Sequence, residues 1–281
     1  MTGEVGRPPG LSGRVAIVTG AAKPDAIGHA VALGLAREGA DVVVADLYEA
    51  GFPGVTRAVE AAGRRCLCVR TDVADPGSVE AMVGEAVAAW GRIDVLVNGV
   101  GGSWGITAED LTAPPRRGFV GLTNCSLDDW RTILGVNLSG AFFCARAVAP
   151  HLAASRGGAI VNFASVAARK GLAPASEGSS GPYAVAKAGI MGMTRQLALE
   201  LAPHGVRVNC VAPGVVMSGR ARRLMAAAGK ERGPEGGVAG VPLGRFATVA
   251  EVAELVVALC CDETAYMTGV TVDVNGASYT A

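Results

Sequence analysis

The segment "GPYAVAKAGIMGMTRQLALE" places a tyrosine and a lysine at positions i and i+4, Tyr183 and Lys187. On a helix, residues at this spacing lie on one face and within reach of each other. Tyrosine is a poor base at neutral pH because its ordinary pKa is about 10, and a neighbouring ammonium group lowers that pKa by stabilising the phenolate. Such a pair can exchange a proton with an alcohol or carbonyl oxygen. The alternative is an ordinary Tyr and Lys on a helix surface.

Two more polar residues can complete a catalytic set. Ser165 follows the apolar run "AIVNFA", and its hydroxyl can hold a substrate oxygen opposite Tyr183, or it can serve only as a turn or cap residue. Asn137 lies in "GVNLSGAFF", an apolar helical pattern in which an amide needs partners. It can bond locally, or hold a water that relays protons to Lys187.

The segment "VAIVTGAAKPDAIGHAVALGLAREGA", residues 15–40, raises the question of a phosphate-binding turn. A dinucleotide fingerprint has closely spaced glycines between a strand and a helix, and here Gly20 and Gly28 frame the turn. Unpaired N–H groups at the start of a helix near Ile27, together with the helix dipole, favour a diphosphate there. We expect Asp25 to cap this helix. The alternative is a plain strand-turn-helix.

Asp46 strengthens the dinucleotide hypothesis because it ends the next apolar run. A carboxylate there can accept hydrogen bonds from a ribose 2′-OH and would repel a 2′-phosphate, which favours NAD over NADP. Lys23 in the first loop can attract a 2′-phosphate, so NADP remains the alternative cofactor. Asp72, in "RTDVAD", can bond to adenine or, with Asp75, cap the helix that follows.

The elements that must position these residues alternate along the chain. Apolar, β-branched runs are each followed by a longer helical pattern, which implies right-handed crossovers and a parallel sheet covered on both faces. We therefore expect an α/β, single-domain Rossmann fold with a doubly wound sheet of about seven strands. The expected strands are 15–18, 42–45, 66–70, 95–98, 159–164, 206–212 and 270–274, and the expected helices lie around 27–38, 54–62, 77–90, 127–150, 182–203 and 248–260.

Composition excludes several classes of function. The 281 residues are half hydrophobic and carry zero formal net charge, so no basic stripe points to nucleic acid. No apolar run approaches the roughly 18 residues that span a bilayer, and residues 1–12, which have no secretory h-region, are expected to form a flexible tail. Seven cysteines without a C-x-x-C motif indicate free thiols in a reducing cytoplasm, and with three histidines we expect no metal site.

Taken together, these residues resemble the short-chain dehydrogenase/reductase family over residues 11–277. The family's opening "T-G-x-x-x-G-x-G" corresponds to Thr19, Gly20 and Gly28, and its "N-N-A-G" to "NGVG" at 98–101. Its catalytic Asn, Ser, Tyr and Lys fall on the four residues described above. Its "P-G" after the sixth strand, and its C-terminal signatures, correspond to Pro213-Gly214, "PLGRFATVAEVAELV" at 242–256 and "MTGVTVDVNGA" at 267–277.

The resemblance implies interconversion of a secondary alcohol and a ketone by hydride transfer. Tyr183 would be the general acid or base, Lys187 would lower its pKa and bind the nicotinamide ribose, Ser165 would orient the substrate oxygen, and Asn137 would support a water relay. The cofactor contacts implied are Gly20, Lys23, Ile27, Gly28, Asp46, Leu47, Asp72, Val73, Asn98, Gly99, Val100, Tyr183, Lys187, Pro213, Gly214, Val216 and Ser218.

Other functions on the same fold stay open. An NADPH-dependent 3-oxoacyl-type ketoreductase is the first alternative, and a non-catalytic dinucleotide-binding protein is the second. Enoyl reduction fits poorly, since relatives that catalyse it space Tyr and Lys further apart. Relatives are commonly tetramers, so the resemblance implies a homotetramer or homodimer that packs through the helices at 127–150 and 182–203.

This chain also departs from the family's pattern. The first loop is longer, and Gly99 replaces the second asparagine, which we expect to loosen that turn. Insertions lie near 102–126, as a substrate flap, a subunit contact or a solvated loop, and at 175–181, beside Tyr183. The expected substrate lid near 215–241 carries Arg220, Arg222 and Arg223, which can bind a carboxylate or phosphate of an anionic substrate or simply form the wet face of a short helix.

Overall fold

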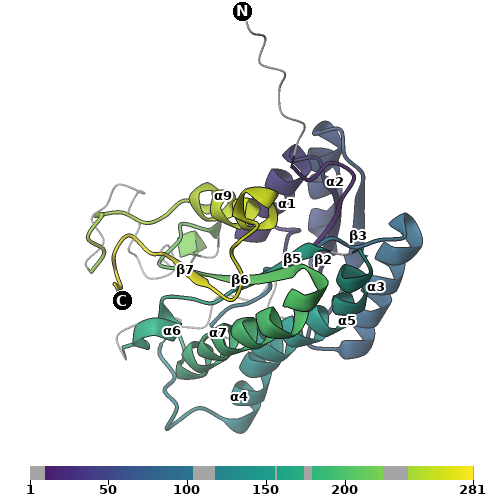
Figure 1. Cartoon of the computed structure of the whole chain (residues 1–281). Coiled ribbons are helices and arrows are strands. Elements are labelled where there is room, and N and C mark those ends of the chain that lie inside the picture. The colour runs from purple at the N-terminus through teal and green to yellow at the C-terminus, as the bar shows by residue number, and fades with distance from the viewer. Residues whose placement is uncertain are drawn as a thin grey trace, which may run out of the picture.

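The protein is built on one seven-stranded sheet in which every strand pairing is parallel (Figure 1). The computed structural model describes residues 10–103, 118–155, 157–173, 179–219, 221–223 and 240–280. The strand order is β3-β2-β1-β4-β5-β6-β7, which confirms the predicted doubly wound α/β fold. The strands are β1 Val15–Thr19, β2 Asp41–Asp46, β3 Cys66–Arg70, β4 Val95–Asn98, β5 Gly158–Phe163, β6 Val206–Pro213 and β7 Thr271–Val274.

The burial of the strands explains why their sequences are apolar without alternation. All residues of β1 and β4 are buried, because these two central strands are covered on both faces. The last strand, β7, lies at an edge of the sheet, and none of its residues is fully buried. Periodicity therefore located the strands, and only their ends differ from the expected ranges.

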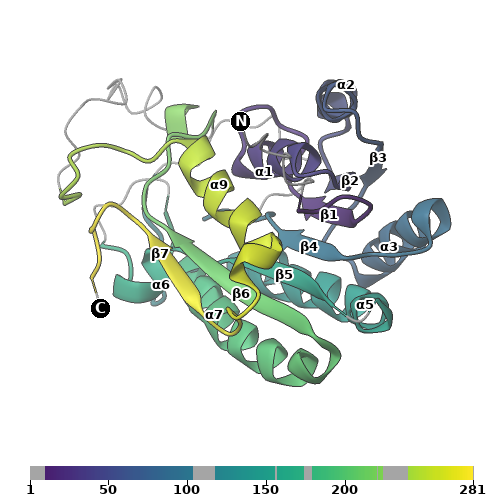
Figure 2. The same cartoon turned by 45° about the horizontal axis from the view of Figure 1, so that its top comes forward.

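Helices form a layer on each face of the sheet, as Figures 1 and 2 show. On one face lie α1 Ile27–Arg37, α2 Phe52–Ala61 and α9 Val249–Cys260, and on the other lie α3 Pro76–Trp90, α5 Gly140–Ala154 and α7 Gly181–Leu201. Two large apolar clusters fill the space between the sheet and these layers. Shorter elements are η1 Glu49–Gly51, α4 Leu127–Leu134, η3 Gly135–Ser139, α6 Ala167–Lys170, η4 Ala202–His204 and η5 Asp262–Thr264.

The predicted helix at 127–150 is a composite. It runs as α4, a π-helical turn η3, and α5, and it ends at Ala154. By length and composition this 28-residue stretch could cross a membrane. A core helix passes the same test, and this one packs against α3 and α7.

Two expectations for the N-terminal part need correction. Residues 10–12 are not a loose tail: Leu11 is fully buried, and its N–H donates to the Glu38 carbonyl at 2.8 Å. Its apolar side chain belongs to the core cluster that also contains residues of α1 and α9, whereas residues 1–9 lie outside the described part of the chain. Asp25 does not cap α1, because the cap position is Ala26 and no side chain bonds there.

Candidate dinucleotide and proton-transfer site

In a doubly wound sheet the ligand crevice is expected where the strand order reverses, and here that point lies between β1 and β4. Thr19, the last residue of β1, accepts hydrogen bonds on its Oγ1 from the N–H groups of Gly99 (3.0 Å) and Val100 (3.2 Å). A Cβ on Gly99 would lie 2.5 Å from the Thr19 carbonyl oxygen. The turn after β4 is therefore held by Thr19, and the expected loosening by Gly99 is wrong.

The first loop fits an anionic diphosphate. Gly20 has φ +74°, which favours glycine, and Gly28 packs so closely on the Gly20 carbonyl that a side chain would collide with it. The first turn of α1 has no acidic residue and no side-chain cap. Its N-terminal N–H groups and dipole are thus not neutralised by this helix's own side chains, which suits a phosphate.

Asp46 lies at the end of β2 with its carboxylate held by two backbone groups. Its Oδ2 accepts from the Ala22 N–H and its Oδ1 from the Tyr48 N–H, each at 3.0 Å. A carboxylate has about four acceptor positions, so this half-buried group retains capacity for ribose hydroxyls. Lys23 lies with its Nζ 5.0 Å from the centre of the Tyr48 ring, and Leu47 follows Asp46 directly.

The residues after β3 and β4 have mainly structural partners. The Asp72 carboxylate accepts from the Ala74 N–H at 2.9 Å, whereas it is Asp75 that caps α3, accepting from Gly77 at 2.9 Å. Val73 is buried and lies against Gly140. The Asn98 amide donates to the Asn162 side chain at 2.8 Å and to the Ala141 carbonyl at 3.3 Å, inside the core.

Tyr183 and Lys187 lie together near the start of α7, as their spacing predicted. The Lys187 ammonium is 5.7 Å from the centre of the Tyr183 ring and donates to the Phe163 carbonyl at 2.8 Å. Lys187 is only 4 % exposed, and this burial lowers its pKa to about 8. A Cβ on Gly101 would lie 2.9 Å from the Lys187 Nζ and 2.7 Å from the Asn137 Oδ1. The backbone after β4 therefore passes directly over both polar groups.

Asn137 lies in the π-helical turn, and both N–H groups of its side-chain amide and one lone pair of its oxygen are hydrogen-bonded. Its Oδ1 accepts from the Gly102 N–H, while its Nδ2 donates to the carbonyls of Gly102 and Ile133, all at 2.9 Å. A π turn shifts backbone bonding from i→i+4 to i→i+5, and the Asn137 amide serves the Ile133 carbonyl at i−4. The Asn137 side chain thus supplies a donor for a carbonyl group beside the widened turn, and it also holds the backbone that follows β4.

Ser165 and the segment after β6 flank this cluster. The half-buried Ser165 accepts on its Oγ from the Ala167 N–H at 3.1 Å, which keeps its own proton available.

Gly214 packs on Asn275, where a Cβ would lie 2.9 Å from that residue's Cα. Val216 is bridged to Ala247, and Ser218 accepts from Ala221 at 3.3 Å. Pro213 ends β6. Arg222 and Arg223 belong to the described chain, whereas Arg220 and residues 224–239 of the expected lid do not.

The two insertions meet beside the start of α7. The Val120 N–H donates to the Ser179 carbonyl at 3.3 Å, and the Gly181 N–H donates to the Val120 carbonyl at 2.8 Å. Ser180 is fully buried, and its hydroxyl donates to the Ser103 carbonyl instead of capping α7. Residues 104–117 and 174–178 lie outside the described part, so the flap hypothesis stays a prediction.

Sequence reasoning missed several residues of this site. Four contacts were not predicted: those of Thr19 with the turn after β4, Gly101 with Lys187, Tyr48 with Lys23, and Ser180 with Ser103. A glycine next to "NGV" was a weak signal for Gly101. The other contacts join residues remote in the chain and had no signal in one sequence.

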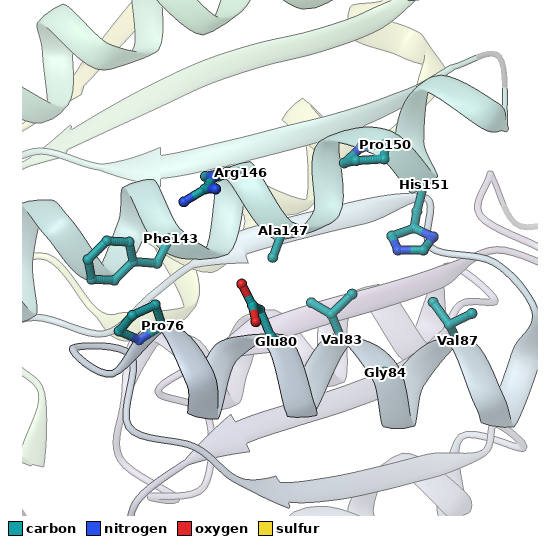
Figure 3. Close-up of a pocket in the computed structure, with 10 residues that line it drawn as sticks. All are labelled: Pro76, Glu80, Val83, Gly84, Val87, Phe143, Arg146, Ala147, Pro150 and His151. Atoms are coloured by element: carbon teal, nitrogen blue, oxygen red, sulfur yellow. The ribbon is translucent and has the colours of Figure 1, made fainter.

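A groove between α3 and α5 lies apart from these residues. Figure 3 shows side chains of α3 facing those of α5 across it. Its lining includes Glu80, Val83, Val87, Phe143, Arg146 and His151, and none of the predicted site residues.

The strand order defines a Rossmann-type α/β fold, and comparison with known proteins gives its family. The family model described as "Enoyl-(Acyl carrier protein) reductase" matches residues 20–277. The chain belongs to the short-chain dehydrogenase/reductase family of oxidoreductases, which bind a nicotinamide dinucleotide. The resemblance inferred from its motifs is thereby confirmed.

Individual relatives cover nearly the whole chain. The 3-oxoacyl-[acyl-carrier-protein] reductase FabG of Thermotoga maritima is 34% identical over 95% of this chain and 98% of its own. The cis-4-hydroxycyclohexanecarboxylate dehydrogenase of Sinomonas cyclohexanicum is 37% identical over 95% of this chain and 97% of its own. A short-chain dehydrogenase/reductase structure from Mycobacterium marinum superposes with a TM-score of 0.79, 28% identity and 98% coverage of both chains.

Proposed function

We propose that this protein is an NAD(H)-dependent oxidoreductase that interconverts a secondary alcohol and a ketone, with Tyr183 as the general acid or base. The observation that carries the proposal is the buried Lys187 ammonium beside the Tyr183 ring. Burying a cation disfavours folding, and groups perturbed in this way concentrate at functional sites. An ammonium at this distance stabilises a phenolate and so makes Tyr183 a useful proton donor and acceptor near neutral pH.

The proposed roles follow from the hydrogen bonds of each side chain. The nicotinamide ring supplies or accepts the hydride when bound. Tyr183 gives its phenolic proton to the carbonyl oxygen in reduction and takes a proton from the hydroxyl in oxidation. Ser165 donates its hydroxyl proton to the same oxygen, because the bond from the Ala167 N–H occupies a lone pair of Oγ and leaves that proton available. Asn137 Oδ1 accepts from Gly102 and has a second lone pair for the proposed relay water.

For the dinucleotide we propose NAD, bound with its diphosphate at the α1 N-terminus and its adenosine ribose at Asp46. The half-buried Asp46 carboxylate keeps acceptor capacity for ribose hydroxyls and would repel a 2′-phosphate. Lys23 supports NADP as the alternative. The remaining predicted contacts, from Asp72 to Ser218, are proposed to bind the rest of the cofactor.

For the substrate we propose a small secondary alcohol or its ketone, including anionic and cyclic ones. The similarity to a cis-4-hydroxycyclohexanecarboxylate dehydrogenase supports a carboxylated cyclic alcohol. The similarity to 3-oxoacyl-[acyl-carrier-protein] reductases favours a second candidate, NADPH-dependent reduction of a 3-oxoacyl group. The four-residue spacing of Tyr183 and Lys187 favours a carbonyl substrate over the enoyl substrate in the family model's description.

We also propose a homotetramer or homodimer in the cytoplasm. Apolar side chains on α5 and α7 are exposed, at 43% for Phe142, 38% for Val185 and 75% for Leu199, and would be covered by a second copy. All seven cysteines are free thiols, which suits a reducing compartment.

The test is a nicotinamide-absorbance assay over secondary alcohols and ketones, including carboxylated cyclic ones and 3-oxoacyl thioesters. We expect Tyr183→Phe to lower turnover by about 10²- to 10⁴-fold, the usual share of a general acid or base, while NAD still raises the thermal midpoint. The control is Tyr266→Phe, a change at a fully exposed ring. Full turnover in Tyr183→Phe would refute the proposed mechanism. If the unaltered protein did not bind NAD, the proposed function would be refuted.

A further inference from the structure

The loop after β1 is fastened to the turn after β2 at the adenosine end of the crevice. One oxygen of Asp46 accepts from Ala22 in the first loop, and the other accepts from Tyr48 in the second turn, each at 3.0 Å. Gly51 lies beneath both segments, where a side chain would collide with the Ala22 carbonyl and would reach within 3.0 Å of the Tyr48 ring. The two segments therefore form one rigid unit around Asp46.

Lys23 lies on top of this unit. Its backbone is one residue from the Ala22 N–H that Asp46 holds, so its long side chain starts within reach of any group bound to Asp46. Yet its ammonium lies over the Tyr48 ring, 5.0 Å from the ring centre. This distance is within the range in which a cation is attracted to an aromatic face.

We propose that Tyr48 is a specificity-determining residue: its ring holds the Lys23 ammonium and withholds it from a 2′-phosphate. A 2′-phosphate bound at this edge would meet the repulsion of Asp46 and the attraction of Lys23. With Lys23 on the ring, repulsion dominates and NAD is preferred. The inference rests on the proposed dinucleotide site. It explains how Lys23 in the first loop and Asp46 at the end of β2, which have opposite charges, together give a preference for NAD over NADP.

The experiment compares Kd values for NAD and NADP, from titrations of the thermal midpoint, in four forms of the protein: unaltered, Tyr48→Leu, Lys23→Gln and the double variant. We expect Tyr48→Leu to raise the affinity for NADP relative to NAD about two- to fivefold, as for the loss of a cation–π contact at a partly exposed site. Lys23→Gln alone should leave the ratio unchanged. The double variant should return to the ratio of the unaltered protein.

Two controls separate the ring from other effects. Tyr48→Phe retains the aromatic face and should keep the unaltered ratio, and Tyr266→Leu makes the same kind of change at a fully exposed site outside the crevice.

Each contrary result has a distinct meaning. A fall in NADP affinity in Lys23→Gln alone would show that Lys23 already serves the phosphate, and would overturn the inference even if Tyr48→Leu failed to fold. An unchanged ratio in Tyr48→Leu, or a raised ratio that persists in the double variant, would overturn it as well. In these cases NAD still binds and the proposed function stands, whereas absence of any NAD or NADP shift in the unaltered protein would remove both.

Discussion

The two ends of the crevice hold their charged groups in opposite ways. Asp46 is half-buried, and backbone N–H groups from two segments contact its two oxygens, so the anion is compensated and still meets solvent. Lys187 is 4 % exposed and has the Phe163 carbonyl as a hydrogen-bond acceptor, and burial lowers its pKa to about 8. The contrast separates the charge proposed for ribose recognition, which backbone groups and solvent stabilise, from the charge proposed for the reaction, which burial destabilises.

The largest expected effect is on the pH dependence of stability at the Lys187 end. Because the folded pKa lies below the unfolded value of 10.5, the folded protein loses this proton first, and its stability relative to Lys187→Met should rise between pH 8 and 10.5. The gain between pH 7 and pH 10 should be about 2 to 3 kcal/mol, measured by urea unfolding of both proteins. Comparison with the variant cancels the contribution of the thiols, because both proteins contain the same seven cysteines. A constant difference between the two proteins would show that Lys187 is not held as a buried cation.

The next largest effect concerns the backbone over Lys187. Gly101→Ala would place a methyl group against the Asn137 Oδ1 and the Lys187 Nζ. We expect turnover to fall about 10²-fold, since a misplacement of about 1 Å in a catalytic group has this cost, while the midpoint shift by NAD is retained. Gly84→Ala, on the open side of α3, is the matched control. Normal turnover in Gly101→Ala would place the reaction elsewhere.

A smaller effect is expected at the recognition end. Asp46→Ala removes the acceptor for a ribose and should weaken NAD binding about tenfold, the worth of a charge-assisted hydrogen bond. It should leave NADP binding unchanged or stronger, because a repulsive charge is lost. Isothermal titration with both dinucleotides measures this, with Asp25→Ala, in the loop after β1, as the control. Equal weakening of both would mean that Asp46 only braces the loop.

The smallest effect is expected where the two insertions meet. Ser180→Ala leaves the Ser103 carbonyl without its donor and should lower turnover about threefold with the KM for NAD unchanged, because a net hydrogen bond is worth about 1 kcal/mol. Ser179→Ala is the control, since only the backbone carbonyl of Ser179 takes part in the pairing with Val120. A raised KM for NAD in Ser180→Ala would indicate a wider loss of structure.

The fold was predictable because its strands are buried on both faces. Runs such as "VAIVT" and "VLVN" are apolar at every position, and the spacing between runs gave the crossovers. The π turn at Gly135–Ser139 was not predictable, because one extra residue barely changes the apolar pattern of a long helix. Leu11 was missed for another reason: a single apolar residue in a polar segment has no periodicity.

The site was predictable where its spacing is local. The i, i+4 relation of Tyr183 and Lys187 needs only one helix. The contacts of Gly102 with Asn137 and of Gly99 with Thr19 join residues 35 and 80 positions apart and depend on strand order. Local sequence also misassigned Asp25, whose carboxylate does not cap α1 because Ala26 occupies the cap position.

The π turn also sets the rotational phase between α4 and α5. Each residue of an α-helix turns the chain by about 100°, and the wider π turn at Gly135–Ser139 absorbs one extra residue. The helix α5 therefore keeps its phase relative to α4, whereas one further residue would turn it by about that angle. The number of residues in this turn therefore fixes both the position of Asn137 and the face of α5 that meets the sheet. Insertions and deletions should be tolerated in the loops of this protein and not in these five residues.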